Sequence, residues 1–378
     1  MVIGINGYEA VVSRFGYNSK TKLPNRVGSS AYCFELLINL NKLDKENEYL
    51  IYVPHKPTSD LPSESENWKY KIIPNRKFWT ITSLGPHFLL NRKKLDVFFS
   101  PTHYLPPFGP GNSVISVLDV SYLYFPELFT KKDLIQLKEW TKFSVKKAKK
   151  ILTISESSKS DMIKEYKVSA NKVVVVYPGI NVQLNASSYL NMEDLKNKFG
   201  INSKYILFVG TLQPRKNIIK LIEAFSKLDK DLELVIVGRK GWQYEEILSA
   251  PGKYGVKDKV RFLDSVTNED LPSLYKSAEF FILPSLYEGF GLPVLEAMSY
   301  GCPVITSNVS SLPEAGGDGA LYVDPEDAND IASKMKKLLE DDELREDLIK
   351  KGYNQVKKFS WEKSARETLK ILEEVGNA

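Results

Sequence analysis

The chain has few of the residues from which disulfides and metal sites are built. Its 378 residues include two cysteines, Cys33 and Cys302, and three histidines, His55, His87 and His103. The cysteines lie far apart and neither belongs to a Cys-x-x-Cys pair, so the sequence predicts neither a disulfide framework nor a cysteine zinc site. No two histidines have the spacing of metal ligands. This composition fits a reducing compartment, and we expect a cytoplasmic protein.

Long hydrophobic runs are also lacking. No stretch approaches the roughly 18 uninterrupted apolar residues that a membrane span requires. The first ten residues, MVIGINGYEA, contain neither the basic nor the apolar region of a signal peptide. Secretion and insertion into a membrane are therefore both disfavoured.

Charge is distributed unevenly along the chain. Residues 1–182 contain 26 Lys and Arg against 16 Asp and Glu, a net charge of +10, whereas the remainder contains 26 against 31, a net charge of −5. A basic first half suggests contact with something anionic, such as a phosphorylated substrate or a lipid surface. Its basic residues are not interleaved with stacking aromatics in any recognised module, so we expect no nucleic-acid partner.

Short apolar runs rich in β-branched residues alternate with segments of helical periodicity, which predicts an α/β fold with parallel sheets. The runs form two series, separated by a polar stretch at 179–203, and this favours two doubly wound domains over one barrel. The polar loop 55–67 reads as an exposed connection. The predicted strands are residues 2–6, 48–53, 96–101, 114–120, 150–155 and 173–178, then 205–211, 233–238, 259–264, 280–284, 303–307 and 320–323.

The most informative segment is PSLYEGFGLPVLEAMSYGCP, residues 284–303, which has the pattern of a strand, a glycine loop, a helix and a further strand. Pro293 suits the first helical turn, because its missing N–H is not needed there. The preceding glycine loop would bring backbone N–H groups to a helix N-terminus, which is a natural seat for a diphosphate. Glu288 and Glu296 flank this position, and their carboxylates can accept hydrogen bonds from hydroxyls. Taken alone, the two acids could equally be solvated residues favoured by the helix dipole.

The pattern Glu288-x7-Glu296 around Gly-Phe-Gly-Leu-Pro resembles the signature of glycosyltransferase family 4, the retaining nucleotide-sugar transferases of the GT-B fold. The best-matched subgroup is rich in mannosyltransferases of surface-polysaccharide assembly. The resemblance implies two Rossmann-like domains that face each other across a cleft, with the C-terminal helix 361–378 returning to the first domain. Residues 1–184 would form the acceptor-side domain and residues 185–360 the nucleotide-sugar domain. Further matching segments are 152–159, 176–180, 206–217 and 359–361.

The resemblance also implies roles in the second domain. Glu288 would contact the transferred sugar and Glu296 the ribose. Arg215 and Lys216, at the carboxyl end of the domain's first strand, would stabilise the charge that develops on the diphosphate, although they could also be a solvated basic turn. Many relatives carry a second arginine where this chain has Thr211, which we place in the donor site. The backbone N–H groups implied to hold the diphosphate and sugar are those of Phe290, Gly291 and Leu292.

In the first domain, Gly28 lies in a segment that resembles the family's glycine-rich phosphate loop, with Arg26 in place of one glycine. Gly28 might alternatively only cap the following helix. Asp119 occupies a strand end where relatives commonly show His-Asp, but Leu118 replaces the histidine and cannot donate a hydrogen bond. Asp119 has an alternative interpretation as a capping carboxylate. His103, at the end of another strand, could stand in for the missing histidine.

Two further segments have alternative interpretations. Residues 131–150 predict a basic amphipathic helix with apolar residues Leu134, Leu137, Phe143 and Val145; it is either a solvated helix with a core stripe or a contact with anionic lipid. Asp229-Lys230-Asp231 matches an Asp-x-Asp metal motif but reads better as a solvated turn.

The resemblance implies a retaining glycosyltransferase that moves a hexose, with mannose favoured, from GDP-mannose or a UDP-hexose to a glycan or lipid-linked acceptor. No metal is expected to be required, since Arg215, Lys216 and the helix terminus supply positive charge. We expect a cytoplasmic enzyme that can contact the inner face of the membrane through its basic first domain. The alternatives are a nucleotide-sugar epimerase or phosphorylase of the same fold, and a protein that binds a nucleotide sugar or glycan without turnover.

Overall fold

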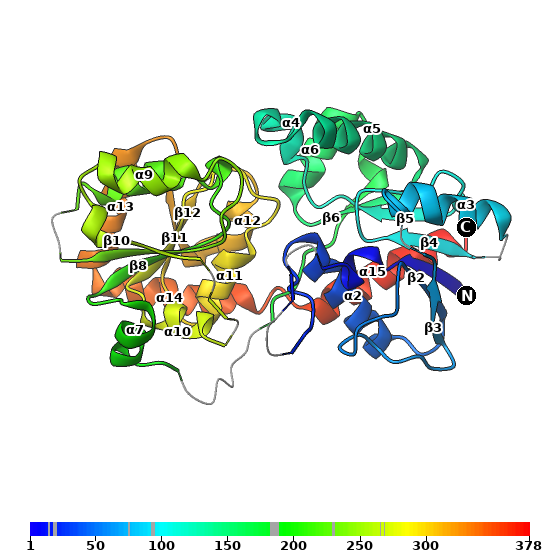
Figure 1. The fold of residues 1–378 in the computed structure, drawn as a ribbon, viewed down its shortest axis with the longest axis horizontal. Helices are drawn as coiled ribbons and strands as arrows, with labels where there is room; N and C mark the ends of the chain where they lie inside the picture. Colours follow the sequence, from blue (N-terminus) through cyan, green and yellow to red (C-terminus); the bar gives the residue numbers. More distant parts are fainter. Residues whose placement is uncertain are drawn as a thin grey trace. The chain divides into compact units, whose positions relative to one another are not determined.

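The computed structural model describes residues 1–13, 16, 17, 21–74, 76–91, 95–181, 189–228, 231–264, 266, 267 and 269–378. These residues form two compact units (Figure 1). The first unit contains Met1–Gly179 and Phe359–Ala378, and the second contains Ile180–Lys358. The boundary predicted at 184/185 falls within residues 182–188, outside the described part of the chain.

The described residues of the first unit form a seven-stranded parallel sheet with the order β3-β2-β1-β4-β5-β6-β7. The order reverses at β1, which pairs with β2 on one side and β4 on the other, as in doubly wound sheets. The strands are β1 Val2–Asn6, β2 Glu48–Val53, β3 Trp68–Ile72, β4 Val97–Ser100, β5 Ser113–Ser116, β6 Lys150–Thr153 and β7 Val173–Val175.

The second unit is built on a six-stranded parallel sheet with the order β10-β9-β8-β11-β12-β13 in its described part. Here β8 and β11 are neighbours, with Phe280 opposite Ile206, and the strand order reverses between them. Their carboxyl ends therefore lie side by side at the switch point of the sheet. The strands are β8 Tyr205–Val209, β9 Glu233–Val237, β10 Val260–Leu263, β11 Phe280–Leu283, β12 Val304–Ser307 and β13 Ala320–Val323.

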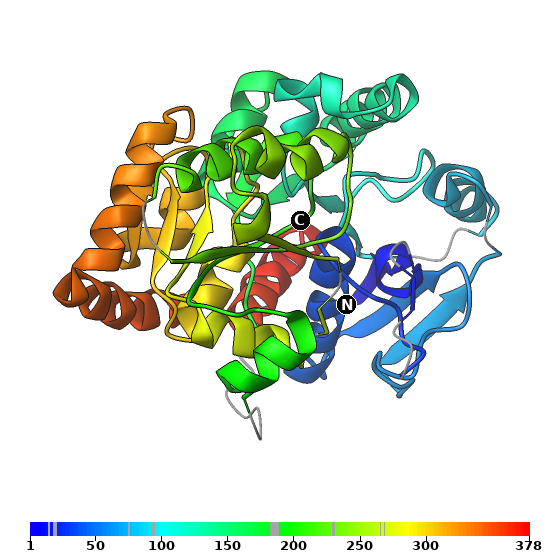
Figure 2. The same cartoon turned by 60° about the vertical axis from the view of Figure 1, so that its left-hand side comes forward.

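Helices connect the strands in both units and pack against the sheets (Figure 2). In the first unit they are α1 Tyr8–Val11, α2 Ser29–Leu43, α3 Gly85–Leu90, α4 Ser121–Tyr124, α5 Lys131–Lys147, α6 Glu156–Tyr166 and α15 Trp361–Gly376, with a π-helical turn η1 at Thr80–Leu84 and 3₁₀ turns η2 Pro126–Leu128 and η3 Ala170–Lys172. In the second unit they are α7 Met192–Phe199, α8 Ile218–Phe225, α9 Glu245–Lys253, α10 Leu271–Ser277, α11 Leu292–Ser299, α12 Leu312–Gly316, α13 Ala328–Glu340 and α14 Asp342–Val356, with 3₁₀ turns η4 Pro214–Lys216, η5 Lys257–Lys259 and η6 Gly317–Gly319.

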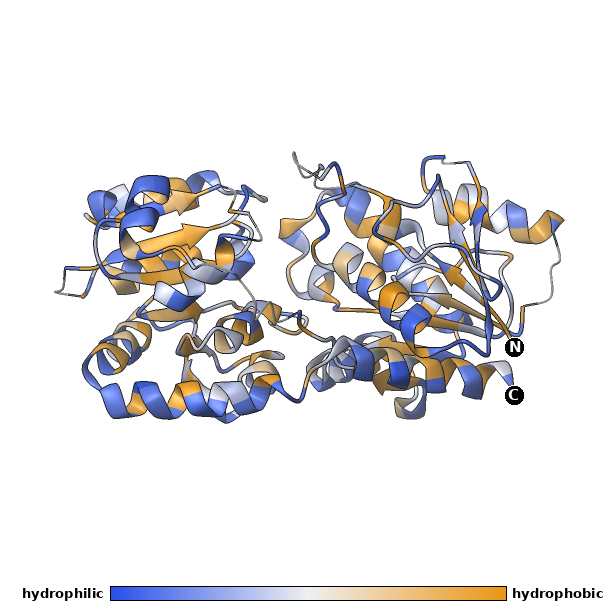
Figure 3. Cartoon of the chain, turned by 90° about the horizontal axis from the view of Figure 1, so that it is seen from below, coloured by the Kyte–Doolittle hydropathy of each residue, from blue (hydrophilic) through white to orange (hydrophobic). Residues whose placement is uncertain are grey.

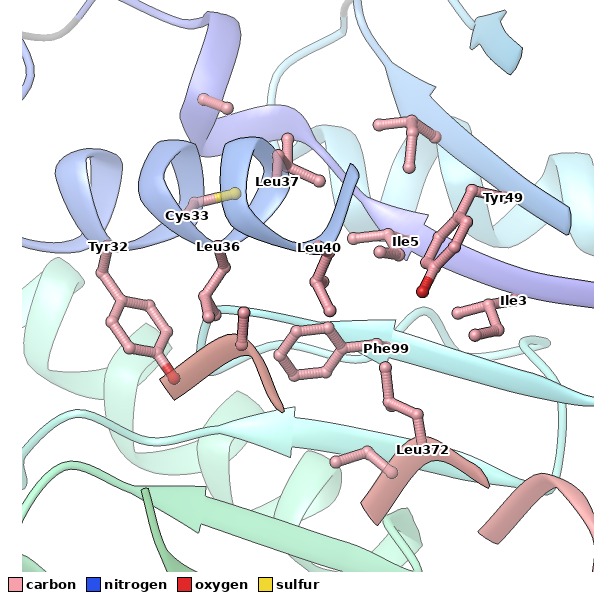
Figure 4. Close-up of a cluster of buried hydrophobic side chains, with 14 of the residues drawn as sticks. Ile3, Ile5, Tyr32, Cys33, Leu36, Leu37, Leu40, Tyr49, Phe99 and Leu372 are labelled. Carbon is pink, nitrogen blue, oxygen red and sulfur yellow. The ribbon is translucent and has the colours of Figure 1, made fainter. Parts of the chain in front are cut away.

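The C-terminal helix α15 belongs to the first unit, which confirms that it returns there. Its apolar residues recur at helical spacing and enter the core formed by α2 and the sheet. Figure 4 shows Leu372 of α15 in the same cluster as Leu36 and Leu40 of α2 and Phe99 of β4. Gly179 packs against the start of α15 and must be glycine, because a Cβ at position 179 would lie 2.0 Å from the backbone nitrogen of Trp361.

The structure corrects several sequence predictions in detail. The strand β3 was not predicted, because only Trp68 at its start is buried and an edge strand has no continuous apolar run. The helix predicted at 131–150 ends at Lys147, and Lys150 begins β6. Its Phe143 is 45% exposed and therefore lies outside the apolar stripe that Val145 anchors in the core.

Hydropathy follows the layers of the fold (Figure 3): the strands are largely apolar, and helices carry polar residues on one side. Among the described residues, no helix combines the length and the apolar character that crossing a membrane requires.

Candidate active site

The site of the second unit begins where β8 and β11 end. The turn η4 follows β8, and residues 284–291 follow β11. The backbone N–H of Leu286 donates to the carbonyl of Arg215 at 2.9 Å, which joins the two segments directly. Asn217, with a left-handed backbone at φ +59°, donates from its side-chain amide to the carbonyls of Pro284 at 3.1 Å and Pro325 at 2.6 Å. The sheet topology therefore brings together residues more than sixty positions apart.

At the junction of the two segments lies the carboxylate of Glu288, which is only 7% exposed. Lys216 Nζ donates to Oε1 at 2.5 Å, and Arg215 Nη1 donates to Oε2 at 3.1 Å. Ser285 Oγ adds a hydrogen bond to Oε1 at 2.7 Å. Burial by itself would raise the pKa of Glu288, but the two cations and these hydrogen bonds lower it to about 2. The carboxylate is thus ionised at neutral pH.

The backbone around Glu288 is held as firmly as its side chain. Its N–H donates to Ser310 Oγ at 3.0 Å, and its carbonyl accepts a hydrogen bond from Ser311 Oγ at 2.8 Å. Arg215 also donates to the carbonyl of Tyr287. The two serines come from the segment between β12 and α12, and no sequence pattern marks them. Ser285, in contrast, lies inside the motif and could have been found there.

The helix α11 begins as its sequence predicts. Gly291 precedes it with φ +106°, and a Cβ at this position would lie 2.8 Å from Leu312 Cδ2. Both the backbone angle and the lack of space therefore require glycine at this position. Pro293 lies in the first turn, and Gly291, the residue that precedes the helix, has no side chain with which to cap it. Phe290 is buried, whereas Leu292 is partly exposed at the helix start. The positive end of the helix dipole thus lies in the same loop as Glu288.

The second glutamate of the motif has the opposite electrostatic character. Glu296 is half-buried on α11, and burial raises its pKa. The hydroxyl of Tyr275, on α10, donates to Glu296 Oε2 at 3.1 Å and partly offsets this effect, as does the charge of Lys216. Lys216 therefore acts electrostatically on both glutamates. Sequence reasoning missed Tyr275, because its role depends on how α10 and α11 pack.

Thr211 lies in the turn after β8 and is exposed. The backbone of this turn is tightly packed, since a Cβ at Gly238 would lie 1.8 Å from the carbonyl oxygen of Gly210. The turn is thus at the same carboxyl end of the sheet as the ion cluster.

In the first unit, Gly28 is the residue that precedes α2, with φ +56°, and among the described residues no atom apart from its chain neighbours lies within 4 Å of where its Cβ would be. It therefore occupies the helix-cap position. Arg26, which replaces a glycine of the family loop, is an anchor: it pairs with Asp60 at 2.5 Å and donates from Nε to the carbonyl of Ala10 at 2.8 Å.

His103 follows β4, and Asp119 follows β5. Burial lowers the pKa of His103, and the negative charge of Asp119 raises it in part. Asp119 Oδ1 accepts the N–H of Ser121 at 2.9 Å, so the carboxylate does cap the start of α4. Leu118 packs against the core. That His103 takes the role of the histidine that relatives show at position 118 stays a prediction.

Metal ligands are scarce in this region. Within the part of the chain that the structure describes, no three His, Cys, Asp or Glu residues are grouped so that they could hold a metal ion. The Asp-x-Asp match at 229–231 lies partly outside the described residues, because Asp229 and Lys230 are not among them.

Comparison with known proteins identifies the family. The family model for glycosyl transferases group 1 matches residues 191–355, a range that includes both glutamates and both cations of the site. O-antigen chain mannosyltransferase B of Escherichia coli is 33% identical over 307 residues, which cover 79% of this chain and 78% of that protein. The chain belongs to the group 1 glycosyltransferases. A second relative of this family, O-antigen chain mannosyltransferase RfbU of Salmonella typhimurium, is 31% identical over 261 residues, 69% of each chain.

Solved structures agree on the fold. WaaG, a glycosyltransferase involved in lipopolysaccharide biosynthesis, superimposes with a TM-score of 0.71 at 16% identity and covers 98% of this chain and 99% of its own. Sucrose-phosphate synthase from Thermosynechococcus elongatus gives a TM-score of 0.74 at 19% identity, with 99% of both chains covered. The predicted GT-B fold is confirmed, and the protein is a glycosyltransferase. The comparisons do not favour the epimerase or the non-catalytic alternative.

Proposed function

We propose that this glycosyltransferase moves a hexose, namely mannose, with retention of configuration from a nucleotide-diphosphate sugar to a hydroxyl of a glycan or lipid-linked acceptor. The observation that carries the proposal is the cluster of Arg215, Lys216 and Glu288 beside the N-terminus of α11. It concentrates positive charge at the switch point of an α/β sheet, which is where such sheets bind nucleotides.

Each part of the cluster has a role in this reaction. As the bond between the sugar C1 and the phosphate oxygen breaks, negative charge develops on the diphosphate, and Arg215, Lys216 and the N–H groups at the start of α11 stabilise it. The acceptor hydroxyl oxygen forms the new bond to C1 from the same side, and its proton passes to the departing phosphate oxygen. Glu288 holds the two cations in place and accepts hydrogen bonds from hydroxyls of the transferred sugar.

The nature of the donor is supported by two kinds of relative. Both O-antigen relatives described above are mannosyltransferases, which favours mannose. Anabaena HepE, solved in complex with UDP-glucose, has a TM-score of 0.71 at 16% identity and covers 98% of this chain and 99% of its own, which favours a nucleotide sugar. GDP-mannose is the first donor to test and UDP-hexoses are the second. We propose that no metal is required, because two cationic side chains and a helix terminus already face the leaving group.

The test has two stages. Thermal unfolding with GDP, UDP, ADP and dTDP in parallel identifies the nucleotide, because a ligand that binds only the folded state stabilises it by about 2.7 kcal/mol at a hundredfold excess over Kd. Transfer from the matching donor to lipid-linked and free glycan acceptors is then measured, with the anomeric configuration of the product read by NMR. The proposal predicts one stabilising nucleotide, an unchanged anomeric configuration and activity in the presence of EDTA. Inversion or donor hydrolysis without transfer would overturn it.

A lipid-linked acceptor would require contact with a membrane surface, and we propose that the first unit makes it at the cytoplasmic face. On α5, Ile135 is 64% exposed and Phe143 is 45% exposed. The ammonium of Lys147 lies 5.9 Å from the centre of the Phe143 ring and donates hydrogen bonds to the backbone carbonyls of Pro106, Pro107 and Gly109. Apolar side chains among lysines are typical of surfaces that bind anionic bilayers. The lysines of α5 are Lys131, Lys132, Lys138, Lys142, Lys146 and Lys147.

Vesicle flotation tests this contact. Binding is expected to phosphatidylglycerol vesicles and not to phosphatidylcholine vesicles, and to weaken with salt. Replacing Ile135 and Phe143 together by serine should reduce binding without changing transfer to a water-soluble acceptor. Equal recovery with both kinds of vesicle would contradict the proposed contact.

A further inference from the structure

Tyr275 is a buried polar residue next to the candidate site, outside the glutamate motif. It is fully buried on α10, and its hydroxyl lies 3.1 Å from Glu296 Oε2 on α11. Two other rings hold the Tyr275 ring in place. It stacks on Tyr300 with the ring centroids 5.8 Å apart, and it packs against Phe281 in a T-shaped arrangement with the centroids 5.6 Å apart. A phenol held in this way can point its hydroxyl in only one direction.

Glu296, in contrast, needs an external constraint. Its side chain has three rotatable bonds and is half-buried, so its carboxylate would sample several positions if nothing held it. A carboxylate can accept hydrogen bonds at both oxygens. A fixed donor at Oε2 therefore determines where Oε1 lies and still leaves acceptor capacity for a ligand.

The charge state of the pair is consistent with this arrangement. Burial raises the pKa of Tyr275 well above its ordinary value, so the hydroxyl keeps its proton and can donate it to the Glu296 carboxylate. Burial also raises the pKa of Glu296, and the hydrogen bond from Tyr275 lowers it again. Removing the hydroxyl would thus loosen the carboxylate and make it easier to protonate.

We propose that Tyr275 is a positioning residue for donor recognition: its hydroxyl orients the Glu296 carboxylate toward the ribose hydroxyls and so determines how strongly the enzyme prefers ribonucleotides over deoxyribonucleotides. The inference rests on the proposed function, together with the ribose contact that the family resemblance implies for Glu296. It adds to that function the residue that enforces ribose recognition from outside the motif.

The experiment measures the Kd of GDP and UDP, together with their 2′-deoxy and 3′-deoxy forms, for the full-length chain and for Tyr275→Phe. A hydrogen bond to a charged group contributes enough to change affinity about tenfold or more. Wild-type protein is expected to bind the better ribonucleotide at least tenfold more tightly than one of its deoxy forms. In Tyr275→Phe this ratio should fall toward one, because the ribonucleotide loses affinity and the deoxynucleotide does not.

Tyr205→Phe is the matched control. Tyr205 is another fully buried tyrosine of the same unit, and its hydroxyl donates to the carbonyl of Leu274 at 2.7 Å, next to Tyr275 in the chain. Its substitution also removes one buried hydroxyl but leaves Glu296 untouched. The ratio of ribo- to deoxyribonucleotide affinity should therefore stay at the wild-type value in this variant, whatever its stability.

Two further readouts separate positioning from packing. In a Glu296→Gln background, Tyr275→Phe should have no additional effect on the ratio, since both changes act on one contact. In the single Tyr275→Phe variant, the loss of ribonucleotide binding on the acidic side should begin at a higher pH than in wild type. Glu296→Gln alone should also lower the ratio, which keeps the ribose contact testable if Tyr275→Phe folds poorly.

The outcomes distinguish the two proposals. A wild-type ratio in folded Tyr275→Phe overturns the positioning role. Binding of nucleoside diphosphates without discrimination in wild type also overturns it but leaves the proposed transferase function standing. If wild type binds none of these nucleotides, the proposed donor site itself is wrong, and the role of Tyr275 falls with it.

Discussion

Lys216 and Glu288 form a buried ion pair, with Nζ 2.5 Å from Oε1, that joins the turn after β8 to the loop after β11. The two residues are 72 positions apart and meet because β8 and β11 are neighbours at the switch point of the second sheet. Both segments also carry groups that we assign to the donor. The pair therefore supports the architecture of the site and its chemistry at once.

Removing one member of this pair should cost both stability and activity. Lys216→Met leaves Glu288 buried with only Arg215 as a cationic partner, and we expect a loss of about 3 kcal/mol in the free energy of unfolding. Transfer should fall by at least a hundredfold. Urea unfolding of the whole chain and an initial-rate assay measure the two effects.

The control for this variant is Lys198→Met, which breaks a 2.7 Å ion pair with Asp270 in the same unit. The Lys198 side chain is half exposed, and the largely buried Asp270 carboxylate keeps its hydrogen bond from Thr267 Oγ1, so the expected cost is smaller than for Lys216→Met and transfer should be unaffected. Combining Lys216→Met with Glu288→Gln should recover stability but not activity. Recovery of activity would contradict the assigned role of the cation.

The pH dependence of stability should reveal the ionised Glu288. Its pKa is about 2 in the folded protein against 4.5 ordinarily, so the unfolded chain binds the proton first. The stabilisation is fully present above about pH 4.5 and is lost as the pH falls toward 2. Between pH 7 and pH 3.5, wild type should lose about 1.5 kcal/mol relative to Glu288→Gln. Parallel pH curves for the two proteins would show that the carboxylate is not held in this way.

Ionisation of Glu296 should have the opposite effect on stability, because it destabilises the folded state. Because burial raises its pKa in the folded state, its ionisation opposes folding as the pH rises through the ordinary range of a carboxyl. Glu296→Gln is therefore expected to raise the thermal midpoint at pH 7 while it weakens nucleotide binding. Calorimetry with and without the nucleoside diphosphate measures both. A lower midpoint in the variant at pH 7 would contradict this assignment.

Gly291→Ala should damage the site through the backbone. The residue would be forced into a φ of +106°, and its Cβ would lie 2.8 Å from Leu312. We expect a cost of about 2 to 4 kcal/mol and a large loss of nucleotide affinity, because the start of α11 would shift.

Gly252→Ala provides the comparison for this change. Gly252 lies in α9 of the same unit, and in the part of the chain that the structure describes, no atom outside its own helix lies within 4 Å of the position of its Cβ. Alanine there should be neutral or stabilising by up to about 1 kcal/mol. The two variants, measured by chemical unfolding and nucleotide titration, should differ in sign of stability change.

Much of the fold follows from local patterns that can be read along the chain. The apolar runs predict β1, β2 and β13 with the bounds that the structure has, because short, largely apolar segments are typical of strands in parallel sheets. The edge strand β3 was not predicted, since most of its side chains are exposed and it has no continuous apolar run. Other strands were predicted too long at their carboxyl ends, because the chain stays apolar there after it has left the sheet.

The candidate site divides in the same way. The sequence by itself determined the helix start at Gly291 and Pro293 and the two acids of the motif, because turn geometry and helix capping depend on neighbours in the chain. Only the tertiary structure decided that Glu288 is an ionised, cation-bound carboxylate and that Glu296 is a half-buried one held by Tyr275. It also turned Arg26 into an anchor for Asp60, 34 positions away. Electrostatics and packing depend on distance in space, and parallel crossovers bring together residues whose separation in sequence carries no periodic signal.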